Sequence, residues 1–136
     1  MRVAFGTDER TAVTDAVVAH LEAEGHTVMF PIEGAEWPEV GRAVAEAVAG
    51  GAVERGVVCC WTGTGVSIAA NKVAGARAAL CTDAGTARGA RRWNDANVVA
   101  LGLRLTSEAV ACEIVDAFLA EPADAAETAA IARVER

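Results

Sequence analysis

Short apolar runs alternate along the chain with longer stretches in which apolar residues recur every three or four positions. The short runs lack strict alternation of polar and apolar residues, which is typical of strands buried on both faces. The longer stretches have the periodicity of helices packed on one side. We predict strands over 2–6, 27–31, 55–60, 76–81 and 98–101. We predict helices over 11–24, 38–50, 66–73, 84–93, 107–119 and 126–136.

The regular succession of strand and helix indicates the fold class. It predicts an α/β protein, a Rossmann-like three-layer α/β/α sandwich with a five-stranded parallel sheet. A length of 136 residues fits a single domain. A break around Pro122 separates a core domain over 1–122 from a C-terminal helical extension over 123–136. We expect this tail to pack on a partner chain.

Composition and charge exclude several classes of function. The formal net charge is −7, so the chain lacks the basic face that a nucleic-acid partner requires. The four cysteines and two histidines lack the spacing of a metal site or a disulfide framework. The sequence has no recognisable signal peptide and no apolar run of membrane-spanning length. We therefore expect a cytoplasmic protein with no membrane partner.

The stretch 59–72, CCWTGTGVSIAANK, carries the chemistry. It joins a predicted strand to a predicted helix through a glycine loop, and backbone N–H groups at a helix N-terminus favour an anion. Cys60 has two interpretations: a small buried hydrophobic residue, or a thiol activated by the helix N-terminus. Cys59 precedes it on the strand and should point to the opposite face of the sheet, into the core.

Other polar residues follow the ends of neighbouring strands. Asp8 comes after the first strand and Arg104 after the fifth, and ligands of such sheets bind at the carboxyl ends of the strands. Asp8 could instead cap the helix that begins near Thr11. Thr62 could serve only the hydrogen bonding of the glycine loop, and Asn71 could either fasten that loop through its side chain or contact a ligand. Arg104 and Arg133 could be solvated charges, although the planar guanidinium suits a phosphate or carboxylate.

The motif Cys-x-Thr-Gly-x-Gly-x-Ser-x-Ala-Ala-Asn-Lys, which begins at Cys60, resembles the sugar-phosphate isomerase family of ribose-5-phosphate isomerase B and galactose-6-phosphate isomerase. The resemblance extends from the N-terminal strand to the tail. It implies an aldose–ketose isomerase that forms an enediolate, with Cys60 as base, Asp8 positioning hydroxyls and Thr62 opening the sugar ring. It also implies a homodimer and requires neither cofactor nor metal. Residues 1–122 would be the isomerase domain.

The resemblance also implies a set of residues around a small sugar or sugar phosphate. Loop N–H groups would stabilise the enediolate, and arginines would bind the phosphate. The expected substrate-binding residues are Glu9, Trp61, Gly63, Thr64, Gly65, Val66, Trp93, Asn94, Arg104 and Arg133.

Two histidines of the family pattern are replaced. Glu9 stands where the family binds phosphate, and Trp93 stands where it places the histidine that assists ring opening. In the tail, the family's Gly-Gly-Arg-His is Glu-Thr-Ala-Ala over 127–130. We therefore predict that ribose 5-phosphate is a poor substrate. The alternative is a catalytically impaired member that binds a sugar-like metabolite or serves as a structural subunit. A nucleotide-binding flavodoxin-like domain is disfavoured, because the glycine loop follows the third strand.

Overall fold

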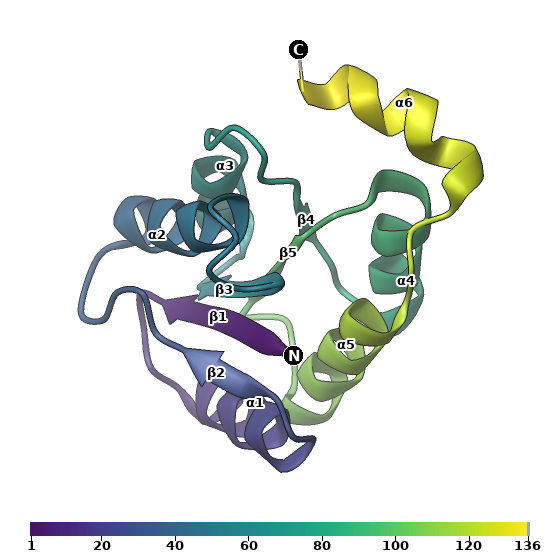
Figure 1. Cartoon of the computed structure of the whole chain (residues 1–136). Coiled ribbons are helices and arrows are strands. Elements are labelled where there is room, and N and C mark those ends of the chain that lie inside the picture. Colours follow the sequence, from purple (N-terminus) through teal and green to yellow (C-terminus); the bar gives the residue numbers. More distant parts are fainter. Residues whose placement is uncertain (136) are drawn as a thin grey trace.

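The computed structural model describes residues 1–135, and Figure 1 shows the arrangement of their helices and strands. The strands are β1 (Arg2–Thr7), β2 (Thr27–Met29), β3 (Arg55–Cys60), β4 (Ala78–Leu80) and β5 (Val98–Gly102). The core helices are α1 (Ala12–Ala23), α2 (Trp37–Ala49), α3 (Thr64–Asn71), α4 (Ala84–Asn94) and α5 (Glu108–Ala120). The tail contains η1 (Ala125–Glu127), α6 (Thr128–Ala132) and η2 (Arg133–Glu135), where η denotes a 3₁₀ helix.

All five strands are parallel and follow the order β2-β1-β3-β5-β4. The chain first runs outward from β1 to β2 and then returns to the other side of β1 as β3. The β1/β3 boundary is therefore a point where the strand order reverses, and ligands of open α/β sheets bind beside such a point. The predicted fold class is confirmed.

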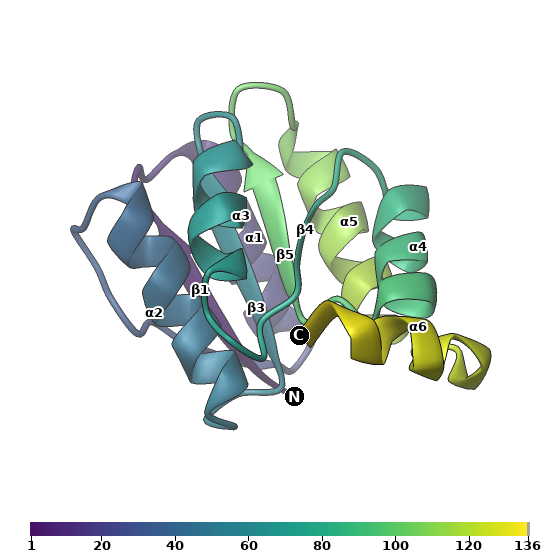
Figure 2. The same ribbon diagram turned by 90° about the horizontal axis from the view of Figure 1, so that it is seen from above.

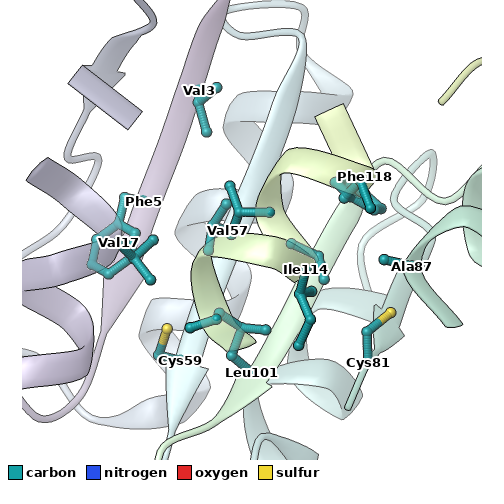
Figure 3. Close-up of a cluster of buried hydrophobic side chains, with 14 of the residues drawn as sticks. Val3, Phe5, Val17, Val57, Cys59, Cys81, Ala87, Leu101, Ile114 and Phe118 are labelled. Atoms are coloured by element: carbon teal, nitrogen blue, oxygen red, sulfur yellow. The ribbon is translucent and has the colours of Figure 1, made fainter. Parts of the chain in front are cut away.

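Helices cover both faces of the sheet, with α1, α4 and α5 on one side and α2 and α3 on the other (Figures 1 and 2). Side chains of the strands alternate between these two cores: Val57 faces the first and Val58 the second. Figure 3 shows the first core, where Phe5 of the sheet lies beside Val17 of α1, and Val57 lies beside Ile114 of α5.

Local sequence signals determine where the helices begin. Thr11 caps α1 through a reciprocal pair of hydrogen bonds with Thr14, and a proline, Pro38, occupies the first turn of α2. Side-chain oxygens of Asp83 and Ser107 cap α4 and α5. The capping role considered for Asp8 is therefore excluded, because Thr11 performs it.

All predicted strands and core helices are present, and their ends differ from the predicted ones by at most two residues. The tail differs more. The prediction was one helix over 126–136, whereas the described part consists of three short helical segments, and Arg136 lies outside the described residues. Because η1, α6 and η2 contain no buried residue, no packed face stabilises one long helix. No helix within residues 1–135 is long and apolar enough to span a membrane.

Candidate active site

Cys60 is the last residue of β3, beside the point where the strand order reverses. Its side chain is 5% exposed and belongs to the core under α2 and α3. Cys59 points to the opposite face and is completely buried, as predicted, and this burial raises the pKa of its thiol far above the usual value. Burial also raises the pKa of the Cys81 thiol, to about 11. Neither Cys59 nor Cys81 is therefore a thiolate near neutral pH.

The loop after Cys60 is held by close backbone packing. Gly63 has φ +78°, and a Cβ there would lie 2.9 Å from the backbone nitrogen of Gly102 and 2.6 Å from a methyl of Leu80. Only glycine allows this conformation and this approach at low cost. The hydroxyls of Thr62 and Thr64 are 2.8 Å apart across the loop. The loop thus reaches α3 with its backbone fixed against the end of β5.

The N-terminus of α3 has no side-chain cap. Thr11, Asp83 and Ser107 cap α1, α4 and α5, whereas α2 and α3 both begin without a side-chain cap, and the N-cap residue of α3 is Gly63. The first N–H groups of a helix have no intrahelical acceptor. Those of Thr64–Val66 consequently remain available to an anion beside Cys60.

Two tryptophans lie near this loop, one packed against α3 and the other exposed to solvent. A Cβ on Gly65 would lie 2.9 Å from the ring of Trp37, so this ring packs directly on the first turn of α3. Trp61 is 54% exposed at the rim of the loop. The indole of Trp61, an expected substrate-binding residue, is therefore accessible to a ligand.

Asp8 lies next to Cys60 across the strand boundary. Thr7 is paired with Cys59 in the β1–β3 register, so the following residue on each strand comes to the same edge of the sheet. The Asp8 side chain is exposed, but partial desolvation raises its pKa, the neighbouring Glu9 raises it further, and backbone hydrogen bonds act in the opposite direction. Glu9 itself is exposed, and its backbone is bonded to the Thr7 hydroxyl.

A cavity of about 550 Å³ opens beside Asp8, between the end of β1, α1 and the loop after β2. It contains Asp8 but not Cys60. Its wall combines aromatic and carboxylate side chains, among them Phe30 and Glu33, which the sequence analysis did not select. Both residues could have been found from the sequence, because the loop after a parallel second strand must reach the same edge of the sheet as Asp8.

Arg104 reaches the same edge from the loop after β5. The N–H of Leu103 donates to the carbonyl of Cys60 at 2.9 Å, and the N–H of Arg104 donates to the carbonyl of Trp61 at 2.8 Å. These bonds join the two loops, while the Arg104 side chain remains exposed.

Three predicted site residues lie at the opposite edge. Trp93 and Asn94 end α4 and precede β5, whereas Arg104 follows β5, so a strand of roughly 16 Å separates the two groups. Arg133 lies in the tail, which is near the edge where the strands begin (Figure 2). One subunit alone therefore does not bring Trp93, Asn94 and Arg133 to Cys60.

Neighbouring polar residues at that opposite edge have structural roles. Asn97 bonds the backbone of Arg77 and Gly75, and Asp95 pairs with Arg77 and Arg91. Asn71 bonds both backbone groups of Ala78 and so fastens β4, rather than the glycine loop. No cluster of three metal-ligating side chains occurs within residues 1–135.

A family model described as Ribose/Galactose Isomerase matches residues 3–136. The chain belongs to this family. Its members act as sugar-phosphate aldose–ketose isomerases, and the resemblance inferred from the Cys60 motif is thereby confirmed.

Curated relatives in this family differ in their named substrates. The chain is 42% identical to ribose-5-phosphate isomerase B of Escherichia coli over 87% of this chain and 83% of that protein. It is 44% identical to the galactose-6-phosphate isomerase subunit LacB of Clostridium acetobutylicum over 74% of this chain, but only 60% of that subunit's length. It is 37% identical to D-erythrulose-4-phosphate isomerase of Pectobacterium atrosepticum over 88% of this chain and 82% of that protein.

A solved member of the family has the same fold. Ribose-5-phosphate isomerase B of Clostridium thermocellum superposes with a TM-score of 0.93 at 35% identity, covering 99% of this chain and 95% of that one. The superposition includes the tail, which therefore belongs to the fold of the family.

Proposed function

We propose that this chain is an aldose–ketose isomerase that acts on a small sugar phosphate or related sugar, with Cys60 as the base. The observation that supports this most directly is the uncapped N-terminus of α3 beside the Cys60 thiol, at the reversal point of the strand order. A base and a set of free N–H donors on one rim suit proton removal next to a carbonyl.

The proposed reaction moves one hydrogen between neighbouring carbons. The Cys60 thiolate removes the proton from the carbon beside the carbonyl, and the electrons of that C–H bond form the enediolate double bond. N–H groups of residues 61–66 stabilise the negative oxygen. The thiol then returns the proton to the former carbonyl carbon, while a hydroxyl proton moves to the other oxygen. Asp8 orients the hydroxyls, and Thr62 assists ring opening where a ring exists.

The remaining substrate contacts are proposed to come from a second copy of the chain. Trp93, Asn94 and Arg133 lie at the edge opposite Cys60, and the described part of the tail, residues 123–135, buries little on its own subunit. A cytoplasmic homodimer that places each tail against its partner's isomerase domain, 1–122, would unite the two groups. Sedimentation of the full chain and of a chain ending at Pro122 tests this, and a monomeric full-length protein would contradict it.

The preferred substrate is proposed to be an open-chain sugar phosphate with four carbons. An aldose whose 4-hydroxyl carries the phosphate has no hydroxyl left for a five-membered ring, so it needs no ring opening. This fits Trp93, since an indole cannot relay a proton near neutral pH. The relative named D-erythrulose-4-phosphate isomerase makes this size class plausible for the fold.

A substrate comparison tests the proposal. We expect a higher kcat/KM with erythrulose 4-phosphate than with ribose 5-phosphate, and a gain with ribose 5-phosphate after the double change Glu9→His and Trp93→His. Turnover of ribose 5-phosphate by the unmodified protein at a kcat/KM on the order of 10⁴ M⁻¹s⁻¹ or more would contradict the assignment.

The second candidate function is a catalytically impaired member that binds a sugar-like metabolite or serves as a structural subunit. It is favoured by one observation: Trp93 is 57% exposed where a proton-relaying histidine is expected. Binding of a sugar phosphate without turnover of any four-, five- or six-carbon substrate would favour this second function over the first.

A further inference from the structure

The tail carries Arg133 and buries no apolar side chain completely on its own subunit, although Ile131 is half-buried. No residue of η1, α6 or η2 is buried, and Val134, beside Arg133, is 65% exposed. Burial of apolar surface is the usual force that docks a terminal helix. Polar contacts therefore contribute strongly to the position of this tail within the subunit.

The polar contacts are concentrated at the two ends of the tail. At its start, Glu121 accepts hydrogen bonds from the Arg92 guanidinium at 2.6 and 2.9 Å, and the N–H of Asp124 donates to the Arg92 carbonyl at 2.8 Å. At its end, one carboxylate oxygen of Glu135 accepts from Arg77 Nη1 at 2.8 Å. The other accepts from the backbone N–H of Gly75 at 3.2 Å.

The two donors that receive Glu135 are held in place by other bonds. Arg77 donates to the backbone carbonyl of Asp95 at 2.8 Å and to its carboxylate at 3.1 Å, and its side chain is only 19% exposed. The amide of Asn97 accepts from the N–H of Arg77 at 2.7 Å and donates to the carbonyl of Gly75 at 2.9 Å. The receiving site for the Glu135 carboxylate is therefore arranged by bonds that do not involve the tail.

Arg133 and Glu135 belong to the same 3₁₀ turn, η2, so about 4 Å of helix rise separates them. We propose that Glu135 is a positioning residue: by binding Arg77 and Gly75, it holds Arg133 where the anionic group of the substrate binds. The inference rests on the proposed function, in which Arg133 contacts that group. Glu135 does not touch the substrate, and its effect passes through Arg133.

Loss of this anchor should weaken binding of anionic substrates without slowing the chemical step. When only a fraction of the molecules hold Arg133 in place, the apparent affinity falls by that fraction. We expect Glu135→Ala to raise the KM for a phosphorylated substrate about three- to tenfold, because the contact is charge-assisted but partly exposed. The kcat should stay within about twofold, since Arg133 binds the anionic group and takes no part in the proton transfer proposed for Cys60.

The experiment compares Glu135→Ala and Glu135→Gln with the matched control Glu127→Ala. Glu127 is also a carboxylate of the tail, but it forms no ion pair within residues 1–135. Arg133→Ala and the double variant with Glu135→Ala complete a cycle. KM and kcat are measured with the phosphorylated substrate and its unphosphorylated counterpart. Competition by inorganic phosphate gives anion affinity without turnover, and hydrogen exchange of residues 128–134 reports whether the tail is held.

The inference predicts a higher KM for the phosphorylated substrate only, weaker phosphate competition, faster exchange in the tail, and no further effect of Glu135→Ala once Arg133 is alanine. Glu135→Gln should lie between wild type and Glu135→Ala, because the bond from Gly75 survives. Additive effects of the two changes, or unchanged exchange in Glu135→Ala, would overturn the inference. A third outcome separates the inference from the proposed function. If Glu135→Ala speeds exchange in the tail but Arg133→Ala leaves the phosphate affinity unaltered, the proposed role of Arg133 in substrate binding is wrong, and the positioning role of Glu135 is wrong with it.

Discussion

The two edges of the sheet are built in opposite ways. Where the strands end, close backbone packing around Gly63 fixes a loop that leaves N–H groups unbonded beside the Cys60 thiol. Where the strands begin, side chains such as Asp95 and Asn97 bond the backbone and charges around them. A polar group without a hydrogen-bond partner lowers the stability of a fold. A fold that nevertheless contains such groups has a place where a ligand can supply the missing partners. The comparison predicts that changes at the first edge affect chemistry and changes at the second affect stability and tail position.

The largest expected effect comes from Cys60→Ala, which removes the proposed base at the first edge. A positioned base contributes roughly 10²–10⁴-fold to the rate, so we expect kcat to fall by that factor. The matched control is Cys59→Ala, on the same strand but in the opposite core. It should lose stability and keep its kcat.

Urea unfolding of both cysteine variants and steady-state kinetics separate these outcomes. Alkylation by iodoacetamide near neutral pH gives an independent measurement. We expect Cys60 to react before Cys112, because burial and nearby carboxylates raise the pKa of the Cys112 thiol. A Cys60→Ala variant that retains a tenth of the activity would exclude this thiol as the base.

The second largest effect is expected for Gly63→Ala, which disturbs the loop rather than the thiol. Its φ of +78° is strained for alanine, and the new Cβ would meet the backbone of Gly102 at 2.9 Å. We expect a loss of about 2–4 kcal/mol in the free energy of unfolding, together with a lower kcat. The control Gly25→Ala has φ +86° but no atom within 4 Å of its Cβ, so it isolates the backbone strain.

Chemical denaturation of Gly63→Ala and Gly25→Ala measures the difference. We expect about 1–2 kcal/mol for Gly25→Ala, with unchanged kinetics. Equal losses in the two variants would mean that the close approach to β5 contributes nothing.

The first edge could be predicted from sequence more fully than the second, for a physical reason. The glycine loop between β3 and α3 and the opposite orientation of Cys59 and Cys60 are local properties, and the structure has both. The carboxyl ends of parallel strands converge, so the positions of Asp8 and Arg104 at one edge followed from chain order. Their proposed roles remain predictions.

The second edge depends on contacts between distant segments. Glu135 meets Arg77, 58 positions earlier, and no periodicity or motif indicates such a pair. The division of the tail into η1, α6 and η2 was missed because its alanine-rich composition favours a helix, whereas a long helix needs a packed face. The strand order β2-β1-β3-β5-β4 also depends on long-range pairing.

A smaller effect, on stability alone, is expected for Asn71→Ala at the second edge. The Asn71 amide accepts from the N–H of Ala78 at 2.8 Å and donates to its carbonyl at 2.9 Å, so the change removes two bonds from the edge strand. We expect a loss of about 1–2 kcal/mol in the free energy of unfolding and an unchanged kcat. Its neighbour Lys72 is exposed, and Lys72→Ala should stay within about 0.5 kcal/mol. A large fall in kcat for Asn71→Ala would assign it to the catalytic edge instead.

The smallest expected effect is the pH dependence introduced by Asp8 at the first edge. Burial and Glu9 raise the pKa of Asp8 in the folded protein, so the folded state binds its proton more tightly than the unfolded state does. Stability therefore falls as the pH rises from the pKa of Asp8 in the unfolded state to its pKa in the folded state, and the loss of stability persists above it.

Asp8→Asn should remove this loss of stability. We expect the variant to match wild type at about pH 3.5 and to exceed it by only a few tenths of a kcal/mol at about pH 7, because solvent screens this exposed carboxylate. Urea unfolding at several pH values measures the difference, and a gain that is the same at every pH would show that the charge of Asp8 is not its cause. The kcat of Asp8→Asn should fall in the same samples, since the carboxylate that costs stability is the group proposed to orient the substrate.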